Sequence, residues 1–137
     1  MTNRSRHPLG RLPLLDGASD AVVERLASLM TPVRLPAGRV LVHQGAPNRQ
    51  FVLIEEGTVR VERAGQQVAV LGPGEFVGEL SLLGDGTATA TVTTTSEVAV
   101  YVSNAAEFAS LLDSAALGTT IADTAAERTS AFTARAS

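Results

Sequence analysis

The chain has 137 residues, of which 45% are hydrophobic and 18% charged, as expected of one globular domain and too few for a reader module joined to a separate effector domain. Its formal net charge is −3, all 11 basic residues are arginines spread along the chain, and only 4% of residues are aromatic. We therefore expect no nucleic acid partner, because such partners need a clustered cationic face or stacking aromatics. The absence of cysteine excludes disulfides and thiolate metal sites.

Residues 1–12 show no periodicity and are predicted to form a poorly ordered arm. No apolar core of a signal peptide follows this basic segment. The longest uninterrupted apolar runs have about five residues, whereas a membrane helix needs roughly 20. We expect a cytoplasmic protein without a membrane partner, with one domain over residues 13–125 and a fraying end of the terminal helix over residues 126–137.

A short amphipathic helix is predicted to begin near Asp20, with either Ser19 or Asp20 able to cap its first turn. Apolar residues then recur at intervals of three and four, as a helix with one buried face requires. They are Val22, Val23, Leu26, Leu29 and Met30.

After Pro32 the apolar period changes from 3.6 to 2, which indicates strands. Alternation is found at Val40 and Val42, Phe51 and Leu53, Val59 and Val61, and again in Thr89–Thr94 and Val98–Val102. Glycines separate the runs of the first block at intervals of about 7–12 residues, as tight turns would. Short strands with this spacing are typical of an antiparallel sandwich or a closed barrel.

The helical signal returns after Asn104, which is predicted to cap a helix over residues 105–112. A weaker, Ala- and Thr-rich terminal helix follows, with its apolar residues widely spaced. These apolar residues are Leu117, Ile121, Ala125 and Phe132.

The most informative segment is Gly74–Leu83, which lies between the two strand blocks. Gly78 allows the backbone to approach a ligand closely, and a short helix starting near Glu79 would aim free N–H groups at an anion. A carboxylate beside an anion site is useful if it accepts hydrogen bonds from a neutral hydroxyl, such as a ribose 2′-OH. Together the two features indicate a sugar-phosphate ligand.

In this segment the chain resembles the cyclic-nucleotide-binding domain family of catabolite activators and protein kinase A regulatory subunits. The likeness covers about residues 13–125 and is carried by several short segments in the family's order. They are Leu14-Leu15, Leu35-Pro36-Ala37-Gly38, His43-Gln44-Gly45, Phe51–Gly57, Phe76–Leu83 and Ala90-Thr91-Val92. The resemblance implies a mainly β fold, a jelly-roll β-barrel of about eight antiparallel strands with N-terminal and C-terminal flanking helices.

The resemblance also implies ligand-binding positions on either side of the loop after Leu83. These are Gly78, Glu79, Leu80, Thr87, Ala88, Thr89 and Ala90. Family members that bind cyclic nucleotides usually carry an arginine two residues before the Ala of Ala-x-Val, and Ala88 stands there. Losing that charge-assisted contact to phosphate removes roughly 1.5–3 kcal/mol, so we expect weak or lost binding of cyclic AMP or cyclic GMP. The hydroxyls of Thr87 and Thr89 remain for another small anion or a neutral ligand.

The terminal helix offers two further interpretations. Thr119 and Thr120 lie about where family members use a helix to cover the base, so one of their hydroxyls is a candidate base contact, although threonine is common in this chain. Leu117, Ile121 and Phe132 would be exposed on a lone helix and form a candidate homodimer seam.

Catalysis is not expected. The only histidines are His7 and His43, which cannot form the two- or three-histidine metal cluster of a jelly-roll cupin enzyme, and we expect no bound metal. No serine lies in a Gly-x-Ser-x-Gly turn. Glu55 and Glu56 are adjacent in a strand and face opposite sides, so they do not form an acid–base pair.

We therefore expect a stand-alone regulatory domain of the cyclic-nucleotide-binding type that senses a ligand. The alternative is a domain with a degenerate pocket that serves as a protein-interaction or assembly module. Ala88 and the lack of an effector domain favour this alternative.

Overall fold

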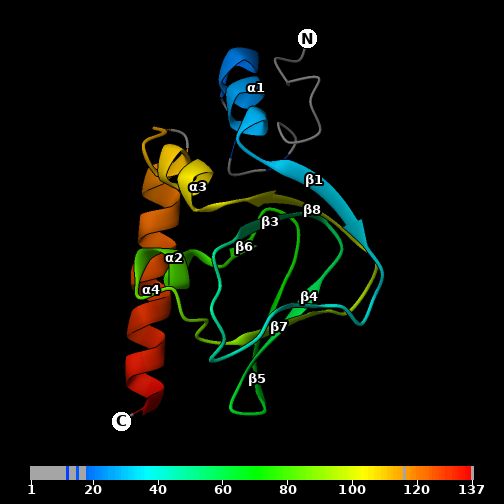
Figure 1. Ribbon diagram of the computed structural model, residues 1–137, viewed down its shortest axis with the longest axis vertical. Helices are drawn as coiled ribbons and strands as arrows, with labels where there is room; N and C mark the ends of the chain where they lie inside the picture. The colour runs from blue at the N-terminus through cyan, green and yellow to red at the C-terminus, as the bar shows by residue number, and fades with distance from the viewer. Residues whose placement is uncertain (1–11, 13–14, 16–17, 116, 137) are drawn as a thin grey trace.

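The computed structural model describes residues 12, 15, 18–115 and 117–136, with side chains in the last helix described to residue 129. Within this part of the chain eight strands form two four-stranded antiparallel sheets, with the orders β1-β8-β3-β6 and β2-β7-β4-β5. The strands are β1 (Thr31–Leu35), β2 (Val40–Val42), β3 (Phe51–Glu56), β4 (Val59–Arg63), β5 (Gln66–Leu71), β6 (Phe76–Val77), β7 (Thr91–Thr94) and β8 (Val98–Ser103). The mainly β fold with flanking helices is confirmed (Figure 1).

Four helices accompany the sheets: α1 (Asp20–Ser28), α2 (Glu79–Leu83), α3 (Ala105–Leu112) and α4 (Gly118–Ala136). Side chains fix where two of them begin. Ser19 Oγ accepts the Val22 N–H at 3.2 Å. Asn104 and Glu107 form a reciprocal capping box, in which each side chain accepts the backbone N–H of the other, at 2.8 and 2.9 Å. The predicted caps at Ser19 and Asn104 are confirmed.

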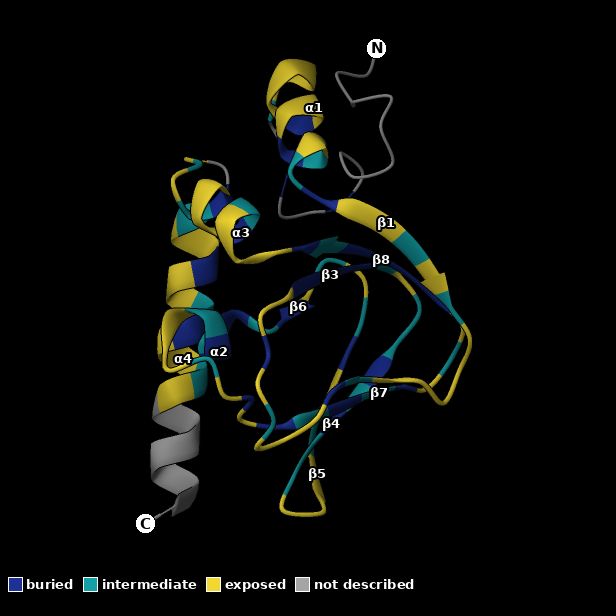
Figure 2. Cartoon of the chain, in the orientation of Figure 1, coloured by how far each residue is buried: buried dark blue, intermediate teal, exposed yellow. Residues whose placement is uncertain are grey.

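The period-2 alternation of β3 divides the core into two layers. Phe51 and Leu53 pack toward the helices, while Val52 and Ile54 pack between the two sheets. Buried residues accordingly follow both faces of the central strands, whereas the β5 hairpin that projects from the barrel is more exposed (Figure 2). The same division puts the helices on one side of the β1-β8-β3-β6 sheet (Figure 1).

Two expectations about the ends of the domain need correction. Leu12, placed in the arm by the sequence, is 4% exposed and belongs to the core on the helix side; the rest of the expected arm, residues 1–11, lies outside the described residues. Leu117 and Ile121 are 2% and 0% exposed in that same core. Leu117 and Ile121 therefore do not form the predicted dimer seam, because α4 buries them within its own domain. The third residue of that seam, Phe132, has its side chain outside the described residues.

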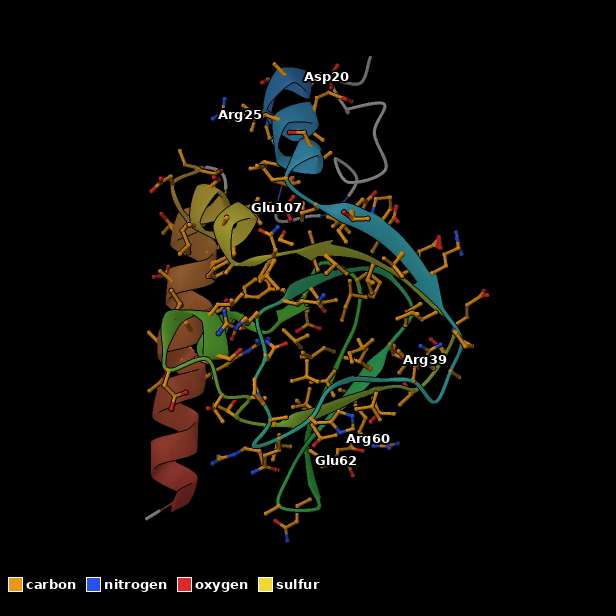
Figure 3. All side chains as sticks on the ribbon, in the orientation of Figure 1. Asp20, Arg25, Arg39, Arg60, Glu62 and Glu107 are labelled. Atoms are coloured by element: carbon orange, nitrogen blue, oxygen red, sulfur yellow. The ribbon has the colours of Figure 1, made fainter. Side chains whose placement is uncertain are left out.

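The side chains on the sheet surface include two ion pairs, Arg60–Glu62 at 3.3 Å and Arg34–Glu56 at 3.5 Å (Figure 3 labels the first). The first pair is half-buried and the second is exposed, and pairs at the surface of this kind contribute little to stability. No helix of the described chain has the length and the apolar character needed to cross a membrane.

Tyr101 on β8 gives the fold a specific pH dependence. Burial raises the pKa of its phenol, and the charge of Glu55 raises it further. The folded state therefore holds the proton above pH 10, where the unfolded chain loses it, so stability is complete below about pH 10 and falls as the pH rises through the folded pKa. The chain has one tyrosine, no cysteine and no lysine, so no other side chain titrates near pH 10.

We therefore expect Tyr101→Phe to remove most of the alkaline decrease in the free energy of unfolding. Urea titrations of the parent and the variant at intervals from about pH 8.5 to 11.5 measure this decrease. An equal decrease in both proteins would show that Tyr101 is not its source.

Candidate functional site

A cavity of about 210 Å³ lies between the β2-β7-β4-β5 sheet, α2 and α4. Its walls on the sheet side are apolar and come from all four strands of that sheet. These wall residues are Val42, Val61, Val68, Ala69, Leu71 and Val92. Among the described residues that line it, only Glu79 and Arg128 carry charge. The cavity therefore has one long apolar wall and one charged end.

Gly78 sets the geometry of the charged end. It follows β6 directly, has φ +96° and is the N-cap of α2. A Cβ at this position would overlap the carbonyl oxygen of Gln50. The predicted short helix near Glu79 is confirmed as α2, and the left-handed backbone at Gly78 is the turn that brings Glu79 to the cavity.

A buried polar cluster ties α2 to the barrel. Asn48 Nδ2 donates to Gln50 O at 2.9 Å and to Ser81 Oγ at 2.7 Å. Ser81 Oγ in turn donates to Gly78 O at 3.0 Å. Asn48 and Ser81 are 9% and 3% exposed, so these bonds form away from water, where an unsatisfied group is costly. Neither residue stands out in the sequence, because a single Asn in a loop has no periodic signal.

Glu79 is 1% exposed, and its partner is Arg128 of α4. Arg128 Nη1 donates to both carboxylate oxygens of Glu79, each at 2.7 Å. The guanidinium also lies over the ring of Phe76, 5.4 Å from its centroid, a favourable position for a cation. The side chain of Arg128 is 23% exposed, so the pair closes one end of the cavity.

Sequence reasoning missed Arg128, because it lies three residues beyond the predicted boundary at 125, in the segment assigned to a fraying tail. The structure continues α4 to Ala136. A signal was nevertheless present: Ile121, Ala125 and Arg128 follow a spacing of four and three, which places them on one face of a helix. Ile121 and Ala125 are buried, and Arg128 continues their face to the cavity.

Most of the predicted ligand-binding positions meet at this cavity. Gly78, Glu79, Leu80, Ala88, Thr89 and Ala90 all line it. Ala88 is 5% exposed and is held by backbone hydrogen bonds in both directions, to Ala46 O and from Gly45 N–H.

Three predicted positions do not line the cavity. Thr87 is exposed, and its N–H donates to Asp85 Oδ1 at 2.8 Å. Thr119 and Thr120 are exposed in the first turn of α4, whereas Arg128, about two turns later, reaches the cavity. In this structure the candidate base contacts therefore face solvent.

The residues that a metalloenzyme would need are not gathered. Among the described residues, no three His, Asp or Glu side chains lie close enough to hold a metal ion. His43 is exposed beside the turn at Gly45, where its carbonyl accepts the Ala46 N–H at 3.1 Å.

Residues 32–115 match the family model of the cyclic nucleotide-binding domain. The chain is also similar to a cAMP-binding acyltransferase from Mycobacterium smegmatis, which was solved as a mutant. The two are 32% identical, the match covers 90% of this chain and 40% of that chain, and the TM-score is 0.75. It is similar to the N-terminal domain of a transcriptional regulator from Streptomyces coelicolor, with 31% identity, coverage of 95% and 94%, and a TM-score of 0.65.

A third solved structure is the regulatory subunit of a cAMP-independent protein kinase A from Trypanosoma brucei. It is a triple mutant, with one substitution of Thr by Arg, and is bound to cAMP in the A site; identity is 25%, coverage 71% and 38%, and the TM-score 0.63. The chain spans only part of its curated relatives, 38% of an acetyltransferase and 20% of a cAMP-dependent protein kinase regulatory subunit.

Proposed function

The chain belongs to the cyclic nucleotide-binding domain family, and on that premise we propose that it is a ligand-sensing regulatory domain that binds cyclic AMP or cyclic GMP weakly. The observation that carries the proposal is the buried Glu79 at the charged end of a cavity whose strand wall is apolar. A carboxylate there suits a ribose hydroxyl, and the apolar strand wall suits a purine ring.

The expected weakness follows from two features of the cavity. Ala88 supplies no cation to the phosphate, which removes a contact worth roughly 1.5–3 kcal/mol, or about tenfold to more than a hundredfold in affinity. The cavity of about 210 Å³ is also below the range of about 300–1,000 Å³ of most ligand sites. A ligand must therefore widen it.

We propose a binding role and no catalysis for this chain. Among the described residues, the titratable groups lining the cavity are an ion pair, Glu79 and Arg128, and no histidine lines it to activate Ser81 as a nucleophile. The response to ligand would be read by a partner protein or by a further domain, in the cytoplasm, where cyclic nucleotides are found as signals.

A second candidate function is a protein-interaction module with a degenerate pocket. The observation that favours it is that the charge of Glu79 is already balanced within the domain, because Arg128 donates to both of its carboxylate oxygens. In this alternative the Glu79–Arg128 ion pair keeps the pocket closed, and no ligand binds there.

Ala88→Arg separates the two candidates. We expect its dissociation constant for cyclic AMP to be about tenfold or more below that of the parent, because the scaffold around position 88 would deliver a guanidinium to the phosphate. Calorimetric titrations with cyclic AMP and cyclic GMP measure the gain.

Ala88→Gln is the matched control, since it fills the same space without charge. A third variant, Ala88→Arg with Asp85→Ala, removes the nearby carboxylate that would otherwise attract the new cation. If no variant binds either nucleotide at millimolar concentration, the proposal of a ligand sensor fails and the degenerate module is favoured.

A further inference from the structure

The charge balance of the cavity raises the question of which residue would face a phosphate. A cyclic nucleotide carries one negative charge, and Glu79 adds a second at the same end of the cavity. Among the described lining residues Arg128 is the one cation available to balance them. Figure 3 labels three other arginines, Arg25, Arg39 and Arg60, and all lie away from α2.

The hydrogen bonds of Arg128 leave it free to take a second anion. A guanidinium has five N–H donors, and the bonds to Glu79 all come from Nη1. Within the described residues, Nη2 and Nε of Arg128 make no hydrogen bond that would have to be broken. These two nitrogens present an edge suited to two oxygens of a phosphate.

Glu79 likewise keeps acceptor capacity. An ionised carboxylate offers about four lone-pair positions, and Nη1 takes one on each oxygen. A ribose hydroxyl can therefore donate to Glu79 while the ion pair with Arg128 stays intact. One ligand would then contact both members of the pair, its hydroxyl at Glu79 and its phosphate at Arg128.

We propose that Arg128 is the phosphate-binding residue of this domain, presented by α4 in place of an arginine at position 88. The inference rests on the proposed function and extends it, because it makes α4 part of the ligand site. Affinity for a cyclic nucleotide then depends on α4, and it depends on the charge of the phosphate.

The test compares Glu79→Gln with the double variant Glu79→Gln, Arg128→Gln. Both variants lack the buried carboxylate of Glu79, so neither contains an unpaired buried charge at position 79. They differ only in whether Arg128 is present. Calorimetry with cyclic AMP and with adenosine, which lacks the phosphate, separates charge recognition from recognition of the base and sugar. Circular dichroism and thermal melting confirm that both variants are folded.

We expect cyclic AMP to bind the double variant roughly 10- to 150-fold more weakly than Glu79→Gln, with a much smaller change for adenosine. In the parent, NMR of the arginine Nε–H groups should show the Arg128 signal shift with cyclic AMP and much less with adenosine.

Equal affinity of the two variants for cyclic AMP would overturn the role of Arg128 and leave the proposed function intact. No binding of either cyclic nucleotide by the parent would overturn the proposed function, and the role of Arg128 with it.

Discussion

Gly78→Val is expected to lower the free energy of unfolding by about 3 kcal/mol or more. At φ +96° a β-branched residue is strained by about 1–3 kcal/mol. Its Cβ would also overlap the backbone oxygen of Gln50, and moving that backbone costs about as much again. Denaturant unfolding followed by circular dichroism measures the change.

Gly86→Val is the matched control, because Gly86 lies in the loop after α2 with a similar φ of +86° but has no heavy atom within 4 Å of where a Cβ would be. It isolates the backbone strain, and we expect a loss of about 1–2 kcal/mol. Equal losses at the two positions would show that the close approach between Gly78 and Gln50 does not contribute.

The second large effect is expected for Arg128→Ala, at about 3 kcal/mol of lost stability. Removing the arginine leaves the carboxylate of Glu79, which is 1% exposed, without its partner, and breaking a buried pair in this way typically costs 3–5 kcal/mol. The expected value is at the low end because the side chain of Arg128 is 23% exposed.

A double-mutant cycle tests the cause. Adding Glu79→Gln to Arg128→Ala replaces the unpaired charge by a neutral amide and should recover a large part of the loss, so the two changes are not additive. Additive losses would mean that Arg128 stabilises α4 through packing on Phe76 and not through Glu79. Urea unfolding of the four proteins at low and at moderate salt gives the coupling energy.

The strand blocks and both helix caps were predictable because they rest on local patterns. The period of 2 in Phe51–Ile54 determines which residues face each layer, and Asn104 caps a helix together with Glu107, three residues later in the sequence. Gly78 and Glu79 could also be predicted as site residues, because they are adjacent in one short sequence motif.

The rest of the site depends on long-range contacts that no local pattern encodes. Glu79 and Arg128 are 49 residues apart, and Asn48 and Ser81 are 33 apart; only the fold brings either pair together. The assignment of Leu117 and Ile121 to a dimer seam was wrong for the same reason. Leu117 and Ile121 have the spacing of an apolar helix face, but the sequence does not say whether the face meets its own core or another chain.

α4 contacts both the core and the cavity along one continuous helix. Ile121 fixes one end in the core, and Arg128, about 10 Å further along at 1.5 Å per residue, holds the cavity. A rigid-body rotation of α4 away from α2 would remove Ile121 from the core, and removal of a buried aliphatic side chain costs several kcal/mol. A motion that opens the cavity and keeps Ile121 in the core must therefore bend α4 between Ile121 and Arg128. Because Ala136 lies further along α4 from such a bend than Arg128 does, a small movement of Arg128 away from Glu79 becomes a larger displacement at Ala136.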